Sequence, residues 1–260
     1  MKKVIGSIVT YNPKMELLTE AIESFLSSYD HSIVYIWDNS ENDQISNHLK
    51  SQFQDRIHYY THHKNYGFGF SHNQNFKLCK NLNFDYFCIV NPDVIIPKNT
   101  IPQFVSLAEL NPSYGLFSGL IYGTDGALHL VHKKLPTFKS YVFDQINKTL
   151  GTRLPVDDFT FPITKTDKPV SIPILSGCFL FLTKSHYDEL GGFDNKIFLY
   201  FEDYDISYRS YIKGKSLVDP SICIIHHWQR DSHRSIKLKL IHIRSGLYFY
   251  WKALSGKYRA

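Results

Sequence analysis

The sequence predicts an α/β fold with a central, mostly parallel sheet flanked by helices. The first hundred residues alternate strand signals with helix signals, which is typical of parallel βαβ units. The first strand, Val4–Val9, is a continuous apolar run, as expected of a strand buried on both faces. The composition, 43% hydrophobic and 20% charged with 14 Gly and 11 Pro in 260 residues, is that of a globular chain and excludes collagen-like and disordered chains.

The other elements of the first half follow from local periodicity and turn residues. Apolar residues at helical spacing between Leu17 and Phe25 predict the first helix. Each short apolar run after it is bounded by turn formers such as Asp38-Asn39-Ser40. In chain order we then expect a strand at Ile33–Trp37, a polar helix around Gln44–Phe53, a strand at Ile57–Thr61, a helix at Ser71–Asn81 and a strand at Tyr86–Val90.

The second half has a more mixed pattern. Residues Gly123–Ser171 are rich in Lys, Asp, Thr and Pro and predict loops with short elements. We see no internal repeat and no linker, so we expect one domain, 1–260, whose second half carries a variable lobe. The remaining expected elements are a strand at Gly115–Tyr122, a return to the core at Ile174–Thr183, a short helix at Tyr204–Ile212 and a late strand at Ser221–Ile225.

A C-terminal amphipathic helix is predicted from Ser235 to Leu254. One stripe is apolar, and Lys or Arg residues lie away from it. Two interpretations stay open: a last helix packed on the core with solvated cations, or an interfacial helix resting on an anionic membrane surface. The stripe consists of Ile236, Leu240, Ile243, Leu247, Trp251 and Leu254, and the cations are Lys237, Arg244, Lys252 and Arg259.

Charge and cysteine content limit the partners and the compartment. Nucleic-acid-binding proteins usually have a concentrated basic face, whereas the net charge of +5 is a small overall surplus, so we expect no nucleic-acid partner. Four Cys without a C-x-x-C pair indicate reduced thiols. The longest apolar stretch, Ile172–Leu182, is too short to span a bilayer. We therefore expect a soluble cytoplasmic protein, which the membrane interpretation of the last helix would place peripherally on the inner face of the cytoplasmic membrane.

Polar residues follow each of the first four predicted strands. Any one of them could be an ordinary turn. In open α/β sheets, however, ligands bind beyond the carboxyl ends of the strands, and the fold brings these four ends to one edge. The four segments are Thr10-Tyr11-Asn12, Asp38-Asn39-Ser40, His62-His63-Lys64-Asn65 and Asn91-Pro92-Asp93.

The glycine pattern excludes two common classes of nucleotide-binding enzyme. A dinucleotide fold needs G-x-G-x-x-G directly after the first strand, and Thr10-Tyr11-Asn12-Pro13 contains no glycine. Gly67-Phe68-Gly69 follows the third strand and has His72 in place of the last glycine. The sequence also lacks the P-loop pattern. A simple dehydrogenase or NTPase is therefore excluded.

Acidic residues point to a different ligand. Asp93, at the end of a buried strand, can offer hard oxygen to Mg²⁺ or Mn²⁺ bound to a diphosphate, or it is a solvated turn carboxylate. Glu202, Asp203 and Asp205 begin a predicted helix, where a carboxylate serves as a general base for an alcohol or as an N-cap. His226 ends the last strand, where it is structural or completes the shell of the ion.

Together these motifs resemble the inverting family 2 glycosyltransferases of the GT-A fold, a Rossmann-like fold, and particularly their bacterial rhamnosyltransferase-like branch. The resemblance covers nearly the whole chain, from Val4 to about Trp251. It rests on the order and spacing of Val9-Thr10-Tyr11-Asn12, Asp38-Asn39-Ser40, Asn65-x-Gly67-Phe68-Gly69 with Asn73, Asn91-Pro92-Asp93, Gly177-Cys178-Phe179, Gly191-Gly192-Phe193-Asp194 and the run from Phe198 to Asp205.

The resemblance implies a nucleotide-sugar-binding half at 1–98, an acceptor-binding half at 99–230 and the C-terminal helix at 231–260. Asp38 would accept the pyrimidine imide N–H from a nucleobase, and Asp93 would bind the metal. The residues implied in nucleotide-sugar binding are Thr10, Tyr11 and Asn12 around the base, Asp38 and Asn39, the loop residues Asn65, Gly67, Phe68, Gly69 and Asn73, and Asn91, Asp93 and Arg230 near the diphosphate.

The resemblance also assigns the chemistry. Asp203 would be the catalytic base, with Glu202 beside it contacting the acceptor. His226 would join Asp93 at the Mg²⁺ or Mn²⁺ site. Tyr200 and Trp228 would contact the acceptor.

Two departures from the family pattern refine the expected activity. Asn91 replaces the first Asp of a strict D-x-D motif, which leaves a weaker metal shell. The Q-x-x-R-W motif of processive synthases is missing, since Trp228-Gln229-Arg230 has the wrong order, which favours transfer of a single sugar.

We expect a glycosyltransferase that moves one sugar, with dTDP-rhamnose favoured as donor by the resemblance. The acceptor would be a hydroxyl of a glycan or lipid-linked oligosaccharide in the synthesis of surface polysaccharide such as O-antigen or capsule. Two alternatives stay open: a UDP-sugar donor (galactose, galactofuranose, GlcNAc or glucose), or an inert nucleotide-sugar-binding protein. A sugar nucleotidyltransferase would need a Gly/Arg-rich signature after the first strand, which the sequence lacks. A homodimer is compatible with the sequence.

Overall fold

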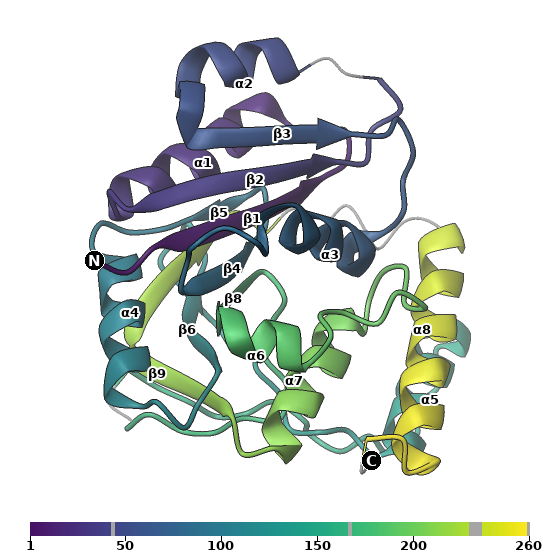
Figure 1. The fold of residues 1–260 in the computed structure, drawn as a ribbon. Helices are drawn as coiled ribbons and strands as arrows, with labels where there is room; N and C mark the ends of the chain where they lie inside the picture. Colours follow the sequence, from purple (N-terminus) through teal and green to yellow (C-terminus); the bar gives the residue numbers. More distant parts are fainter. Residues whose placement is uncertain (43–44, 166–167, 229–235, 259–260) are drawn as a thin grey trace.

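One mixed sheet organises the chain (Figure 1). The computed structural model describes residues 1–42, 45–165, 168–228 and 236–258. In the described part the sheet has nine strands. Their spatial order is β3 (Ile57–Thr61), β2 (Ser32–Asp38), β1 (Val4–Thr10), β4 (Tyr86–Val90), β8 (Phe179–Thr183), β6 (Leu116–Tyr122), β9 (Ser216–His226) and β5 (Val94–Ile95), while β7 (Leu128–His129) pairs with β6.

The first half of the sheet is parallel, as predicted. Strand β1 lies between β2 and β4 and is parallel to both, and β3 extends the sheet beyond β2. The register sets Thr10 opposite Asp38, and Asp38 opposite Thr61, so these strands end at the same edge. Strand β8 runs antiparallel between β4 and β6, and β9 is parallel to β6. The fold is therefore the mixed, mostly parallel sheet that the sequence predicts.

Helices cover both faces of the sheet. Side chains of α1, α2 and α4, including Leu18, Leu49 and Phe104, pack in one core cluster. Side chains of α3, α6 and α7, including Phe76, Tyr187 and Ile206, pack in the other. The helices are α1 (Met15–Ser28), α2 (Ser46–Phe53), α3 (Phe68–Cys79), α4 (Thr100–Leu110), α5 (Phe138–Leu150), α6 (Lys184–Glu189), α7 (Glu202–Ile212) and α8 (Ile236–Leu254), with a 3₁₀ turn at Gln54–Arg56.

Several elements differ from the sequence prediction, among them α5, α4 and β9. Helix α5, 13 residues long, lies where loops with short elements were expected, and Thr137 caps it by accepting the Ser140 N–H at 3.1 Å. Helix α4 lies in a stretch for which we predicted no element. Strand β9 begins at Ser216 rather than Ser221, because Pro220 falls within an irregularity of the β6–β9 register and does not end the strand.

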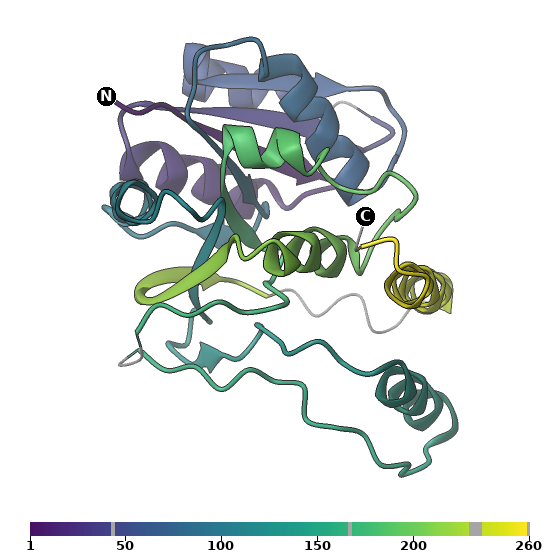
Figure 2. The ribbon, with the colours of Figure 1, turned by 60° about the horizontal axis from the view of Figure 1, so that its bottom comes forward.

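A third cluster, separate from the two sheet faces, joins α5, α7 and α8. Figure 2 views α5 and α8 nearly end-on, beside one another at one side of the molecule. The buried members of this third cluster are all aromatic: Tyr141, Phe201, Phe249, Tyr250 and Tyr258. No helix within the described ranges is both long enough and apolar enough to cross a bilayer.

The inward face of α8 is not the apolar stripe that the sequence displays. Ser245, Gly246, Phe249 and Tyr250 are buried, whereas most of the stripe is exposed. Lys252, predicted to be solvated, is directed inward, with its side chain 12% exposed and its Nζ 2.5 Å from Asp205. The helix packs on the protein through aromatic rings and an ion pair, which a hydrophobicity pattern does not reveal.

Candidate active site

A cavity of about 430 Å³, open to solvent, lies at the ends of β1 and β4. The residues after the two strands form most of its wall, as expected where parallel strands end at one edge. Of the residues predicted to bind nucleotide sugar, Thr10, Tyr11, Asn12, Phe68, Asn91 and Asp93 line this cavity. Lys14, a cation that the motif search did not single out, lies at the same wall. Its position directly after Thr10-Tyr11-Asn12-Pro13 is the signal that could have identified it.

Two polar atoms in this wall have unused hydrogen-bonding capacity. Thr10 Oγ1 and Asn91 Oδ1 are buried and have no hydrogen-bond partner in the described part of the chain. Buried polar atoms of native proteins are nearly always satisfied, so such atoms at a cavity wall indicate a ligand or ordered water. The Tyr11 ring, 53% exposed, adds an aromatic surface at the mouth. The cavity therefore suits a ligand with both a planar and a polar part.

Pairing of β5 with β9 brings Asp93 and His226 together. Val94 is the register partner of His226, so the preceding carboxylate lies against the imidazole, with Asp93 Oδ1 3.0 Å from His226 Nε2. A carboxylate oxygen and an imidazole nitrogen suit Mn²⁺, and the carboxylate also suits Mg²⁺. Within the described residues, no cluster of three or more His, Cys, Asp or Glu side chains is assembled as a metal cage. Of the described residues, Asp93 and His226 would thus supply two ligands, and a cation here would take the rest from a diphosphate and water.

Asp38 fixes the segment that follows β1 through hydrogen bonds. Its side chain is 1% exposed and accepts hydrogen bonds from Ser40 N at 2.8 Å and Tyr59 Oη at 2.7 Å. Ser40 Oγ donates to Asp38 Oδ1 and accepts the Asn12 N–H at 2.7 Å. The residue lies beside Thr10 through the β1–β2 register but not among the residues that line the cavity. Asp38 is therefore placed to hold Asn12, and contact with a base would use its remaining lone pair.

Asn39 and Asn65 shape the loop before α3. Asn39 Oδ1 accepts hydrogen bonds from Ser71 Oγ at 3.0 Å and Tyr66 N at 3.3 Å. Asn65 Oδ1 accepts the Gly67 N–H at 2.9 Å. Gly67 has φ +90°, and a Cβ there would collide with the carbonyl of Phe198, so the loop requires glycine. This geometry directs Phe68 into the cavity wall.

Asn73 and Gly69 face away from the cavity. Asn73 Nδ2 donates to Phe193 O at 2.8 Å, and its Oδ1 accepts hydrogen bonds from Tyr187 Oη at 2.7 Å and Phe193 N at 2.9 Å. A Cβ on Gly69 would approach Phe193 Cβ to 2.7 Å. Both residues join α3 to the Gly191–Asp194 loop, so the structure does not bring them to the predicted nucleotide site.

Asp203 is fixed at the start of α7. Tyr200 and Phe201 have φ of +64° and +67°, a left-handed conformation that costs on the order of 1 kcal/mol or more per non-glycine residue and is concentrated at functional sites. Asp203 Oδ2 accepts the Gly177 N–H at 3.1 Å, and Oδ1 accepts the Tyr204 N–H at 2.9 Å. A Cβ on Gly177 would lie 2.9 Å from Asp203 Cβ, so glycine permits this close approach.

Glu202 is a buried carboxyl, and Asp203 beside it is half-buried. Burial raises the pKa of Glu202, and the charge of Asp203 raises it further. Burial also raises the pKa of Asp203, but the Gly177 N–H and the nearby Lys133 cation act in the opposite direction. Glu202 Oε2 has no hydrogen-bond partner within the described residues. Of the two carboxyls, Asp203 therefore has the partners that favour its ionised form, whereas Glu202 has none of them.

The segment at Gly177 and Cys178 connects this pair to the strand-end cavity. Gly177 N–H donates to Asp203, and the carbonyl of Cys178 accepts the Asn91 N–H at 2.9 Å. Burial raises the pKa of the Cys178 thiol to about 12, with the charges of Asp93 and Asp203 contributing in the same direction. Asp93, after β4, and Asp203, at the start of α7, thus both lie near this short segment.

Asp205 is occupied by structural contacts. It is fully buried, and its carboxylate accepts hydrogen bonds from Arg209 Nε at 2.8 Å, Lys252 Nζ at 2.5 Å and Tyr258 Oη at 2.6 Å. Both oxygens are thus bonded to side chains of the protein and shielded from solvent, which leaves no place for an acceptor hydroxyl to approach them. Of the two aspartates, the geometry favours Asp203 for proton transfer.

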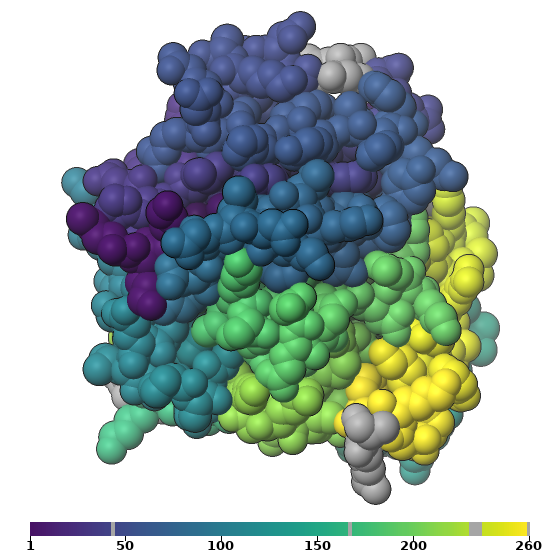
Figure 3. All heavy atoms as spheres, viewed as in Figure 1, coloured from purple at the N-terminus to yellow at the C-terminus, as the bar shows by residue number. Residues whose placement is uncertain are grey.

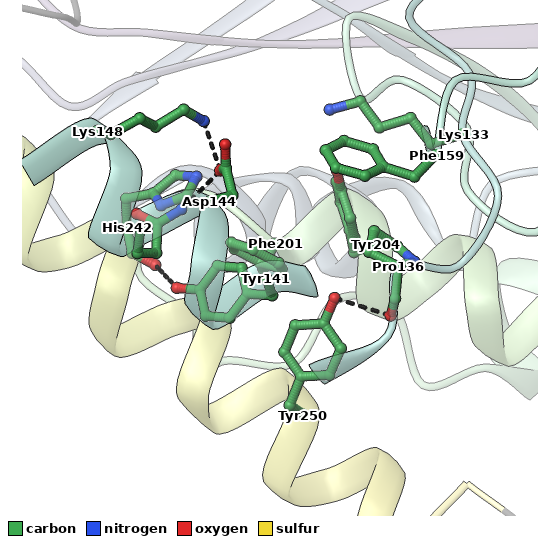
Figure 4. Close-up of a pocket in the computed structure, with 11 residues that line it drawn as sticks. Lys133, Pro136, Tyr141, Asp144, Lys148, Phe159, Phe201, Tyr204, His242 and Tyr250 are labelled. Carbon is green, nitrogen blue, oxygen red and sulfur yellow. Dashed lines mark hydrogen bonds and ion pairs between the residues drawn. The ribbon is translucent and has the colours of Figure 1, made fainter. Parts of the chain in front are cut away.

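A second, smaller cavity of about 60 Å³ lies between α5, α7 and α8 (Figure 4). Its walls are mainly aromatic, and Tyr204, the neighbour of Asp203, is one of them. Lys133 Nζ lies over the rings of Phe159 and Tyr204, at 5.3 and 5.5 Å from their centroids. Burial lowers the pKa of Lys133, while Asp203 and Asp144 oppose that shift. We did not single out Lys133 from the sequence, because it lies in the stretch that we interpreted as loops.

The remaining predicted residues are dispersed. Tyr200 packs beside the ring of His242, at 5.3 Å, in the aromatic cluster. Trp228, 41% exposed, contacts His129 at 5.0 Å and His226 at 5.8 Å between ring centroids. Arg230 lies outside the described residues.

Two rhamnosyltransferases are similar in sequence to this chain. It is 28% identical over 183 residues to the N-acetylglucosaminyl-diphospho-decaprenol L-rhamnosyltransferase of Mycobacterium tuberculosis, covering 68% of this chain and 58% of that protein. It is 25% identical over 175 residues to the rhamnosyltransferase WbbL of Escherichia coli K12, covering 64% of this chain and 63% of the relative. The aligned region thus spans less than two thirds of the length of these relatives.

Solved structures share the fold. The mannosyltransferase PcManGT from Pyrobaculum calidifontis, in complex with GDP-Man and Mn²⁺, superposes with a TM-score of 0.60 at 13% identity, covering 97% of this chain and 64% of that one. GalNAc-T7 with UDP, GalNAc and Mn²⁺ gives a TM-score of 0.66 at 13% identity, covering 98% and 51%. The GT-A fold prediction is confirmed. The model of glycosyl transferase family 2 matches residues 7–191, and the chain belongs to that family.

Proposed function

We propose that the protein is an inverting, metal-dependent glycosyltransferase that moves one sugar from a nucleoside diphosphate to a hydroxyl acceptor. The observation that carries the proposal is the strand-end cavity with its unsatisfied Thr10 and Asn91 atoms, joined to Asp203 through Gly177 and Cys178. The proposal divides the chain into a donor half at 1–98, an acceptor half at 99–230 and a C-terminal helix at 231–260.

The donor would occupy the strand-end cavity. Tyr11 offers a ring for the base, and Asp93 with His226 would hold Mg²⁺ or Mn²⁺ against the diphosphate. When bound, such a cation stabilises the negative charge that develops on the leaving diphosphate. Lys14 is the cation of the cavity wall, and we propose that it adds to that stabilisation. The Mn²⁺ in the structures of two proteins of the same fold supports a divalent cation here.

Asp203 would act as the general base. Its carboxylate takes the proton of the acceptor hydroxyl, and the oxygen attacks the anomeric carbon from the face opposite the diphosphate. The new glycosidic bond forms as the bond to the diphosphate breaks, and the electron pair leaves with the diphosphate. Protonated Glu202, buried beside Asp203, adds no second negative charge. This step needs one base and no covalent intermediate.

The names of the sequence relatives support rhamnose as the sugar, and the name of the mycobacterial relative supports a lipid-linked saccharide as the acceptor. We propose dTDP-rhamnose as the donor and the synthesis of surface polysaccharide as the context. The aromatic cavity beside Tyr204 is the candidate acceptor subsite, since aromatic faces pack against the C–H faces of sugars. A UDP-sugar donor is the alternative that the geometry equally accommodates.

A binding screen tests the proposal. The protein is incubated with dTDP-rhamnose, UDP-galactose, UDP-glucose and UDP-GlcNAc, each with and without Mn²⁺, and the thermal unfolding midpoint is measured. We expect one donor to raise the midpoint, and to do so more strongly with Mn²⁺. Slow hydrolysis of that donor would distinguish an enzyme from an inert binding protein. Absence of any shift across the panel would contradict the donor site.

A further inference from the structure

Helix α8 presents an apolar stripe to solvent. The stripe residues Ile236, Leu240 and Leu254 are 78%, 63% and 72% exposed. Leu247 and Trp251 are 46% and 49% exposed. Single exposed apolar residues are ordinary on protein surfaces, but a continuous row along one helix marks a site of interaction.

The helix cannot rotate to bury this stripe. Lys252 Nζ lies 2.5 Å from Asp205 and 2.7 Å from Asp194, and both carboxylates belong to the body of the protein. Gly246 lies so close to the Tyr141 hydroxyl that a Cβ would collide with it. Rotation would break the buried ion pairs and remove Phe249 from the aromatic cluster. The outward orientation of the stripe is therefore fixed by the fold.

Helix α5 extends the same face. A groove of about 300 Å³ lies between α5 and α8 and is lined almost entirely by apolar atoms. Leu247 lines it from α8, and Leu150, 72% exposed, lines it from α5. In the space-filling view α8 lies at the surface along one edge of the molecule (Figure 3). We call this surface, made of the stripe and the groove, the α5–α8 face.

The charges beside the stripe identify its occupant. Successive helical residues are about 100° apart, so Lys237 and Arg244 flank the stripe on one side and Lys239 on the other. Beyond the end of the helix, Lys257 Nζ lies 3.8 Å from the centroid of the Trp251 ring. All four are exposed, and α8 contains no acidic residue. Apolar side chains flanked by cations match an anionic bilayer, where the chains insert and the cations meet the headgroups. A symmetric contact with a second copy would instead set like charges against one another.

We propose that the α5–α8 face docks on the surface of an anionic lipid bilayer. The apolar groove and the aromatic cavity share Tyr141 and Gln145 as wall residues, so docking brings the candidate acceptor subsite to the membrane. This last consequence rests on the proposed function, since it supposes a saccharide acceptor carried by a lipid. The docking itself depends only on the face.

Co-sedimentation with vesicles tests the proposal. The full chain is mixed with vesicles of 3:1 phosphatidylcholine and phosphatidylglycerol, or of phosphatidylcholine alone, at low and high salt. We expect binding to the anionic vesicles that weakens at high salt, because salt screens the contribution of the cations. Binding to the anionic vesicles should exceed binding to phosphatidylcholine alone.

Matched variants locate the face. Leu240→Glu with Leu247→Glu should weaken vesicle binding by at least about tenfold, because two apolar anchors are lost. Arg244→Glu should weaken it by roughly fivefold or more. The controls Leu110→Glu, which alters an 81% exposed leucine of α4, and Lys77→Glu, on α3, should bind as the parent does. All of these positions are exposed, so folding should survive, and thermal unfolding checks this.

Three results would overturn the docking proposal. They are a parent protein that stays in the supernatant at low salt, equal losses in the controls, or sedimentation velocity showing a dimer that Leu240→Glu dissociates. Donor binding without vesicles is measured in the same variants and should remain unchanged. If the unmodified protein binds no donor, that result would contradict the proposed function, but it would not affect the conclusion on docking.

Discussion

Replacing Asp205 by Asn should destabilise the protein and loosen α8. The carboxylate is fully buried. It forms ion pairs with Arg209 at 2.8 Å and Lys252 at 2.5 Å and accepts a hydrogen bond from the Tyr258 hydroxyl at 2.6 Å. Asparagine keeps the shape but removes the charge, which leaves two cations facing a neutral amide. Removing one partner of a buried ion pair costs about 3–5 kcal/mol.

The lower end of that range is the better expectation here. Lys252 retains Asp194 at 2.7 Å, and Arg209 retains the carbonyls of Leu190 and Gly192 at 2.6 and 2.7 Å. A loss of about 3 kcal/mol in the free energy of unfolding corresponds to a fall in Tm of roughly 6–12 °C for a chain of this size. Amide hydrogen exchange should report the loss first in α8, since the lost contacts with Lys252 and Tyr258 anchor the C-terminal segment.

Asp144→Asn is the matched control. Asp144 pairs with Lys148 at 2.6 Å along one turn of α5, and the Lys148 side chain is 61% exposed. An exposed helical pair of this kind contributes about 0.3–0.5 kcal/mol, so Tm should change little. The assay is thermal unfolding followed by circular dichroism, with exchange measured at one temperature below both transitions. Equal stability of the Asp205→Asn and Asp144→Asn proteins would refute the assignment of Asp205 as the anchor of α8.

Three further predictions concern the site. Asp93→Ala should abolish the increase in donor affinity caused by Mn²⁺, measured by calorimetry; an increase that persists would place the cation elsewhere. Lys133→Met should move the acidic limb of the pH–rate profile to higher pH, because the lysine cation lowers the pKa of Asp203; an unmoved limb would contradict that coupling. Glu202→Gln should raise stability relative to the parent as pH increases above about 4.3, the ordinary pKa of Glu, because a buried carboxyl with a raised pKa destabilises the fold once the unfolded chain ionises. The Tm difference between the two proteins, followed from acid to alkaline pH, should therefore widen, and a constant difference would contradict the shift.

The parallel half of the sheet was predictable because its signals are local. Continuous apolar runs and the turn residues after them define β1 and β4, and the topology of βαβ units then places their ends together. This is why the sequence alone groups Thr10, Asn91 and Asp93. Asp93 and His226 were both identified, but their contact depends on the β5–β9 register, which the sequence does not reveal.

Other features depend on tertiary contacts. The apolar side chains of α5 pack against α8 rather than against the sheet. The stretch that holds α5 and Lys133 is rich in Lys, Asp, Thr and Pro, so we interpreted it as loops and overlooked both. Asn73 matches the family motif, yet its side-chain bonds with Phe193 show a positioning role. The stripe of α8 was visible, but only the contacts of Phe249 and Lys252 show that it faces outward.

The most direct test of the account is the turnover of Asp203→Asn beside that of Asp205→Asn. Asparagine at 203 keeps the shape of the side chain but removes its basicity, so turnover should fall by roughly 10²-fold or more. Donor affinity should change little, because the proposed donor site is the strand-end cavity with Asp93, apart from Asp203. Asp205→Asn, assayed below its lowered Tm, should retain most of its turnover. An active Asp203→Asn protein together with an inactive, folded Asp205→Asn protein would show that the base is the other carboxylate.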